Sequence, residues 1–97
     1  MIVVHFKVQA RPEKTEDLRA ALAAVVPAAR ATEGVISFDI AADVTDETCF
    51  VATEVFEDQA ARDRQEGLPE VAAVMALLPN ALAGPPTLRS YETAATS

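Results

Sequence analysis

The chain has 97 residues, of which 51% are hydrophobic, and its formal net charge is −7 at pH 7. This length suits one small domain, which we place at residues 1–97, and domains of this size are often stabilised by oligomerisation. A strongly acidic surface repels phosphate backbones and anionic lipids, so we expect no nucleic-acid partner and no membrane partner. No stretch approaches the ~20 apolar residues that cross a bilayer, and a cytoplasmic protein is expected.

The N-terminal part of the chain predicts a strand followed by a helix. Residues 2–9 alternate between apolar and more polar positions, a period of two that is typical of strands. From Thr15 to Thr32, apolar residues recur at three- and four-residue spacing, which predicts an amphipathic helix. Pro27 lies inside this pattern and lacks an N–H, so it should kink the last turns.

The middle of the chain predicts two further strands joined by a hairpin. Residues 35–41 alternate again, and the polar residues 43–47 are typical of a hairpin loop. The loop leads into a strand at 48–56, which is apolar on both of its sides. That double-sided character is unusual for a sheet with one face in water.

The C-terminal part predicts a helix in two pieces and a last strand. Asp58 is suited to cap a short helix that ends near Gln65. Gly67 and Pro69 separate it from a more apolar helix, and Gly84-Pro85-Pro86 ends that second piece. Residues 87–93 then predict the closing strand.

The order β-α-β-β-α-β predicts an α+β, ferredoxin-like fold. Right-handed crossovers fold such a chain into a four-stranded antiparallel sheet with the helices on one face. The other face would be open, yet strand 48–56 is apolar on that side too. We therefore expect a homodimer in which a second copy covers the open sheet face.

Three stretches carry a resemblance to a known family: T-E-G-V-I-S-F-D-I, D-V-T-D-E-T-C-F and V-A-T-E-V-F-E-D-Q-A-A. They resemble the antibiotic biosynthesis monooxygenase (ABM) family, and the resemblance covers nearly the whole chain. It implies a dimeric α+β barrel that acts, without a cofactor, as a monooxygenase on a small hydroxylated aromatic such as a quinol or polyketide anthrone. Many members of the family have histidines where Gln65 and Glu70 stand in this chain.

The implied chemistry needs an apolar pocket, a general base and polar groups that hold an oxyanion. His5 is the only imidazole in the chain. Because an imidazole has an unperturbed pKa of about 6.5, His5 is the first choice for the catalytic base. The alternative is a partly exposed or interface histidine that bonds a neighbouring strand.

Five other residues are candidate substrate contacts: Tyr91, Arg89, Gln65, Ser37 and Glu54. Tyr91 and Arg89 share a face of the last strand, where the arginine could clamp an anion or serve only as a salt-bridge partner. Gln65 can position a substrate but cannot take a proton. Ser37 is either a polar lining residue or a surface residue.

Glu54 lies in the middle of an apolar strand, where a carboxylate is costly unless it is paired. We expect an ion pair with Arg89 or Lys7 from another strand. The alternative is an acid or base in a pocket with a raised pKa.

Other chemistries find little support in the sequence. Cys49 is alone, which predicts a small buried or half-buried apolar residue and no intrachain disulfide or cysteine-based metal cluster. No phosphate-binding glycine motif and no metal-ligand spacing occur, so neither a cofactor nor a metal is predicted. Two alternatives stay open on the same scaffold: a non-catalytic protein that binds a small aromatic ligand, and a lyase, cyclase or isomerase.

Overall fold

The computed structural model describes residues 1–94 and contains one antiparallel four-stranded sheet. The strands are β1 (Ile2–Gln9), β2 (Val35–Asp43), β3 (Asp46–Phe56) and β4 (Thr87–Glu92). Their order across the sheet is β2-β3-β1-β4. Residues 95–97 of the domain predicted at 1–97 lie outside the described residues.

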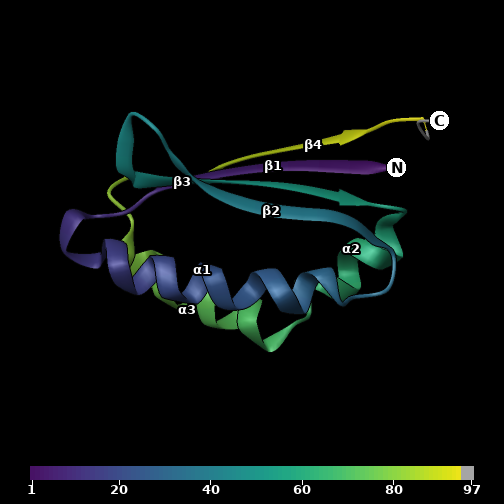
Figure 1. The fold of residues 1–97 in the computed structure, drawn as a ribbon, viewed down its shortest axis with the longest axis horizontal. Coiled ribbons are helices and arrows are strands. Elements are labelled where there is room, and N and C mark those ends of the chain that lie inside the picture. Colours follow the sequence, from purple (N-terminus) through teal and green to yellow (C-terminus); the bar gives the residue numbers. More distant parts are fainter. Residues whose placement is uncertain (95–97) are drawn as a thin grey trace.

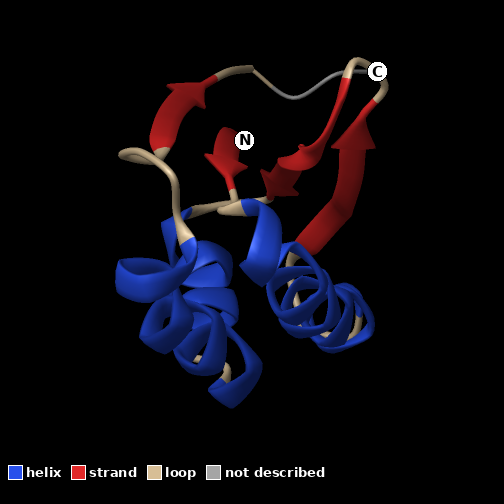
Figure 2. Ribbon diagram, turned by 90° about the vertical axis from the view of Figure 1, so that its left-hand side faces the viewer, coloured by secondary structure: helices blue, strands red, loops and turns tan. Residues whose placement is uncertain are grey.

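The helices all lie against one face of this sheet, as Figures 1 and 2 show. They are the short η1 (Pro12–Lys14), α1 (Thr15–Arg30), α2 (Gln59–Glu66) and α3 (Pro69–Ala81). The ferredoxin-like α+β fold predicted from the sequence is therefore confirmed. In the described part of the chain, no helix is both long enough and apolar enough to cross a membrane.

Helix α1 forms the larger part of the helical layer because its apolar stripe is continuous. Leu18, Leu22, Val25 and Ala29 are buried in the main core, together with residues of β1, β2, β3 and α3. Pro27 lies inside the helix one turn before its end. The stripe thus holds α1 along the sheet even though Pro27 donates no backbone hydrogen bond.

The β2–β3 hairpin is tighter than the sequence predicts. Asp43 pairs with Asp46, so the expected loop at 43–47 is reduced to Val44 and Thr45. Oδ1 of Asp43 accepts hydrogen bonds from the backbone N–H of Thr45 (2.8 Å) and from its hydroxyl (2.6 Å). These short-range bonds let the strands extend to the turn.

The junction between β3 and α2 is fixed by a cap and by close packing. Oδ1 of Asp58 accepts a hydrogen bond of 2.9 Å from the backbone N–H of Ala61, which confirms the predicted N-cap. Gly34, which precedes β2, has φ +85°, and a Cβ added there would lie 2.5 Å from the Cβ of Ala61. Only glycine fits this position without strain, and the contact sets α2 close to the start of β2.

The register of the sheet decides which side chains face the helices. Val4 pairs with Glu54 and Phe6 with Ala52, all on the helix-facing side. His5 pairs with Thr53 on one neighbour and with Arg89 on the other, and these three point to the open face. Successive strand residues alternate between faces, so neighbours in sequence are separated by the thickness of the sheet.

Candidate functional site

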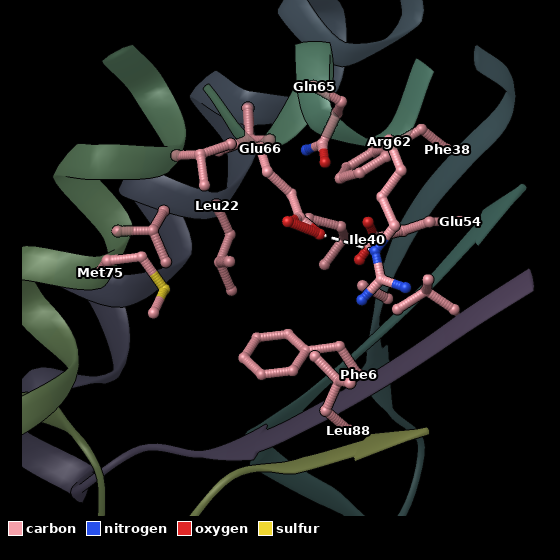
Figure 3. Close-up of a pocket in the computed structure, with 15 residues that line it drawn as sticks. Phe6, Leu22, Phe38, Ile40, Glu54, Arg62, Gln65, Glu66, Met75 and Leu88 are labelled. Atoms are coloured by element: carbon pink, nitrogen blue, oxygen red, sulfur yellow. Dashed lines mark hydrogen bonds and ion pairs between the residues drawn. The ribbon is translucent and has the colours of Figure 1, made fainter. Parts of the chain in front are cut away.

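A cavity of about 380 Å³ lies between the helix-facing side of the sheet and the helices (Figure 3). Most of its lining is apolar and comes from all four strands and from α1 and α3: Val4, Phe6, Leu22, Val25, Phe38, Ile40, Ala52, Val71, Val74, Met75 and Leu88. Both the volume and the apolar lining are typical of small-molecule sites.

The mouth of the cavity is marked by two exposed apolar side chains. Met75 of α3 is 57% exposed and Leu88 of β4 is 55% exposed, although both line the cavity. Val74 and Leu78 of the same helix are buried. Met75 therefore lines the cavity at its exposed edge.

Four polar residues line the same cavity: Glu54, Arg62, Gln65 and Glu66. Glu54 comes from the middle of β3, in register with Val4 on one side and Phe38 on the other. The other three are on α2. Gln65 and Glu66 lie three and four residues after Arg62, which places them on the same side of the helix as Arg62. A strand and a helix adjacent in sequence thus supply all the polar groups of the site.

Glu54 is the most perturbed acid of the site. Its carboxylate forms no hydrogen bond or ion pair with any other side chain described here. Burial raises the pKa of Glu54 to about 7, and the neighbouring Glu66 adds to that rise while Arg62 opposes it. A carboxylate that titrates near neutrality can take a proton from a substrate at physiological pH.

Neither of the expected partners reaches Glu54, so that prediction is wrong. Nζ of Lys7 lies 3.8 Å from the carboxylate of Asp43. Arg89 points to the opposite face of the sheet. Glu54 is therefore the pocket carboxylate that the sequence offered as the alternative.

Arg62 connects α2 with the edge strand. Its Nε donates to Oε1 of Glu66 at 2.7 Å, and its Nη1 donates to Oγ of Ser90 at 2.9 Å. The guanidinium thus lies between the helix and β4, beside Glu54 (Figure 3). Its charge is already matched by that of Glu66.

Gln65 presents its amide to the cavity (Figure 3). The side chain is 3% exposed and makes no hydrogen bond to another described residue. In residues 1–94, every fully buried polar side-chain atom has a hydrogen-bond partner. Because the Gln65 amide has none, its atoms are not fully buried, and they reach the open space of the cavity. One amide therefore offers both a donor and an acceptor to a ligand.

Of the residues predicted to form the site, only Glu54 and Gln65 line this cavity. His5, Arg89 and Tyr91 belong to the open face of β1 and β4, and Ser37 belongs to the same face through its pairing with Val55. The sheet lies between these four residues and the cavity. The predicted base, His5, is therefore not placed to act within this cavity.

Arg62 and Glu66 were not recognised from the sequence. The available signal was that Gln65 and Glu66 lie three and four residues after Arg62, because residues at these spacings on a helix share a face. Nothing in the sequence indicated that this face would meet Glu54, since that meeting depends on how α2 packs on the sheet.

Cys49 does not line the cavity. The Cys49 thiol is buried and donates a weak hydrogen bond of 3.6 Å to Asp46. Burial raises the pKa of Cys49, and so does the nearby Asp46, which makes the thiol a poor nucleophile. In residues 1–94, no three His, Cys, Asp or Glu side chains are grouped so that they could hold a metal ion.

Comparisons with known proteins agree with this architecture. A family model described as antibiotic biosynthesis monooxygenase matches residues 1–77. No curated protein matches the chain.

Solved structures share the fold at low sequence identity. The Rv0793 protein of Mycobacterium tuberculosis is 23% identical, with a TM-score of 0.88 over 99% of this chain and 97% of that one. A crystal structure described as antibiotic biosynthesis monooxygenase is 19% identical, with a TM-score of 0.87 over 98% of this chain and 100% of that one. The PA3566 protein of Pseudomonas aeruginosa is 22% identical, with a TM-score of 0.86 over 97% and 94% of the two chains.

Proposed function

The chain belongs to the antibiotic biosynthesis monooxygenase family, and we propose that it is a cofactor-independent monooxygenase of a small hydroxylated aromatic, such as a quinol or an anthrone. The observation that carries this proposal is Glu54: a carboxylate with a pKa of about 7 in an otherwise apolar cavity. Cavities of this kind bind small aromatic molecules, and the carboxylate supplies a base.

The reaction is balanced by the substrate and dioxygen alone. Glu54 takes a proton from the bound substrate, and the resulting electron-rich anion transfers an electron to dioxygen. The two radicals join to form a C–O bond, the proton held by Glu54 passes to the resulting peroxide, and loss of water leaves a new oxygen substituent on the ring system. The substrate supplies all the electrons, one oxygen atom enters the product and the other leaves as water.

The neighbours of Glu54 have distinct roles in this proposal. The Gln65 amide holds a substrate oxygen, and the apolar walls exclude water from the anion. Arg62 limits the rise of the Glu54 pKa and so keeps the carboxylate available as a base near neutrality. His5, Tyr91, Arg89 and Ser37 are assigned no contact with the substrate, since they point to the other face.

The test is oxygen uptake by purified protein with a panel of quinols and anthrones, without added metal or flavin. Uptake faster than buffer that depends on Glu54 supports the proposal, and the product should contain one oxygen atom from labelled dioxygen. Uptake no faster than buffer, together with saturable ligand binding, would instead favour the non-catalytic binding protein. The Gln65 amide favours that second function, because it binds a ligand without moving a proton.

We also propose that the protein is a homodimer through its open sheet face. Val51 and Val55 of β3 are half-buried on that face in the single chain, and Cys49 is buried beside them. A second copy would remove this apolar surface from water. The free thiol of Cys49 is in keeping with a reducing compartment, and we propose a cytoplasmic location, which cell fractionation tests.

A further inference from the structure

We propose that the cavity selects uncharged ligands that carry two oxygen substituents, one held by Glu54 and the other by the amide of Gln65. This inference names the ligand class of the proposed active site and rests on that function only in taking the cavity as the place where the substrate binds. Two observations support it: Arg62 is already paired with Glu66, and the amide of Gln65 makes no hydrogen bond to another described residue.

The charges that line the cavity leave no cation for an anionic ligand. The single guanidinium, Arg62, is bound to Glu66 at 2.7 Å and to Ser90 at 2.9 Å. Glu54 then remains as the unmatched charge when it ionises. A carboxylate ligand would have to displace Glu66 from Arg62 or lie unpaired beside Glu54, and both arrangements are costly in an apolar cavity.

The amide of Gln65 adds the second requirement. It is almost fully buried, is aimed into the cavity and has no partner among the described side chains (Figure 3). A ligand without a matching oxygen leaves that amide unsatisfied, and sites built this way discriminate strongly against such ligands. Apart from these two groups and the paired Arg62 and Glu66, the walls are apolar, which favours a planar ring system.

Three naphthalene probes of matched size test the proposal: 2-naphthol, 2,7-dihydroxynaphthalene and 2-naphthoate. The chain contains no Trp and one Tyr, so the fluorescence of the naphthalene ring reports binding with little background. At pH 7.5 the diol should bind about tenfold more tightly than 2-naphthol, and 2-naphthoate at least about tenfold more weakly than 2-naphthol. Titrations under argon separate binding from turnover.

Two variants identify the groups responsible. Glu66→Gln leaves Arg62 without its carboxylate partner, so the affinity for 2-naphthoate should rise about tenfold relative to that for 2-naphthol. Gln65→Met keeps the volume but removes the amide, and it should abolish the preference for the diol. Glu13→Gln removes an exposed carboxylate of η1 outside the cavity and should change neither result. Circular dichroism establishes that each variant is folded, and Gln65→Asn is the second variant if Gln65→Met is not.

Three results would overturn the proposal: equal affinity of the wild type for naphthol and naphthoate, a diol preference that survives loss of the amide, or no binding of any probe up to about millimolar concentration. Selective binding without oxygen uptake would leave this inference standing and remove the proposed function. Oxygen uptake with unselective binding would do the reverse.

Discussion

His5 and Glu54 lie on neighbouring strands but point to opposite faces of the sheet. His5 pairs with Thr53, whereas Glu54, the next residue of β3, pairs with Val4 on the helix-facing side. The only imidazole of the chain is therefore separated by the sheet from the cavity that Glu54 lines. This relationship decides which residue is expected to act as a base.

Replacing Glu54 should impair oxygenation, whereas replacing His5 should not. We expect Glu54→Gln to lower kcat/KM by about 100-fold or more, in the usual range for loss of a general base. His5→Gln should leave kcat/KM within about twofold of the wild type. Steady-state oxygen uptake with the best substrate of the panel measures both. Full activity in Glu54→Gln would remove its assigned role.

The pH dependence of the wild type should follow the ionisation of Glu54. The carboxylate must be ionised to accept a proton, so kcat/KM should rise with pH and level off above about 7. Glu66→Gln should move the midpoint to lower pH, because the charge of Glu66 contributes to the raised pKa. A profile that is flat, or that falls between pH 5 and 8, would contradict this assignment.

Glu54 should also reduce the stability of the folded chain at high pH. Its folded pKa of about 7 lies above the ordinary value of 4.5, so ionisation favours the unfolded chain as pH rises through this window. We expect Glu54→Gln to raise the free energy of unfolding at pH 8 by up to about 3 kcal/mol, with little effect near pH 4. Urea titrations at both values test this, with Glu13→Gln as the control. An equal effect at the two values would contradict the linkage.

Alanine substitutions at Gly34 and at Gly84 test the close packing of α2, with Gly84 as the control. Gly34→Ala places a Cβ 2.5 Å from that of Ala61 at φ +85°, so we expect a loss of about 2 kcal/mol or more. A Cβ at Gly84 meets nothing within 4 Å, and Gly84→Ala should stay within about 0.5 kcal/mol. Thermal or urea unfolding of both variants measures the difference. Equal stabilities would mean that the close approach of α2 to β2 does not exist in solution.

The proposed dimer gives a prediction for the open face. Sedimentation at micromolar concentration should give a dimer for the wild type and a monomer for Val51→Lys, because a charged side chain would be buried between the apposed sheets. Glu13→Lys changes the charge outside that face and should remain dimeric. A wild type that is strictly monomeric at this concentration contradicts the proposal.

Much of the fold follows from local patterns in the sequence. The two-residue alternation of β1 and the apolar stripe of α1 predict those elements, and the Asp58 cap starts α2 where expected. The same alternation places His5 on the polar side of β1, opposite Phe6, which faces the helices. That signal excludes His5 from the cavity beneath the helices, whereas the ordinary pKa of an imidazole taken alone favours it as a base.

The sequence by itself determined the order of strands and helices, because each element depends on contacts between residues a few positions apart. Only the tertiary structure decided that Glu54 meets Arg62, Gln65 and Glu66 around one cavity, and that Arg62 reaches Ser90 on the far strand. Those contacts depend on the sheet register and on the packing of α2, which long-range burial sets. The raised pKa of Glu54 has the same origin, since it comes from burial and from Glu66, neither of which a strand pattern contains.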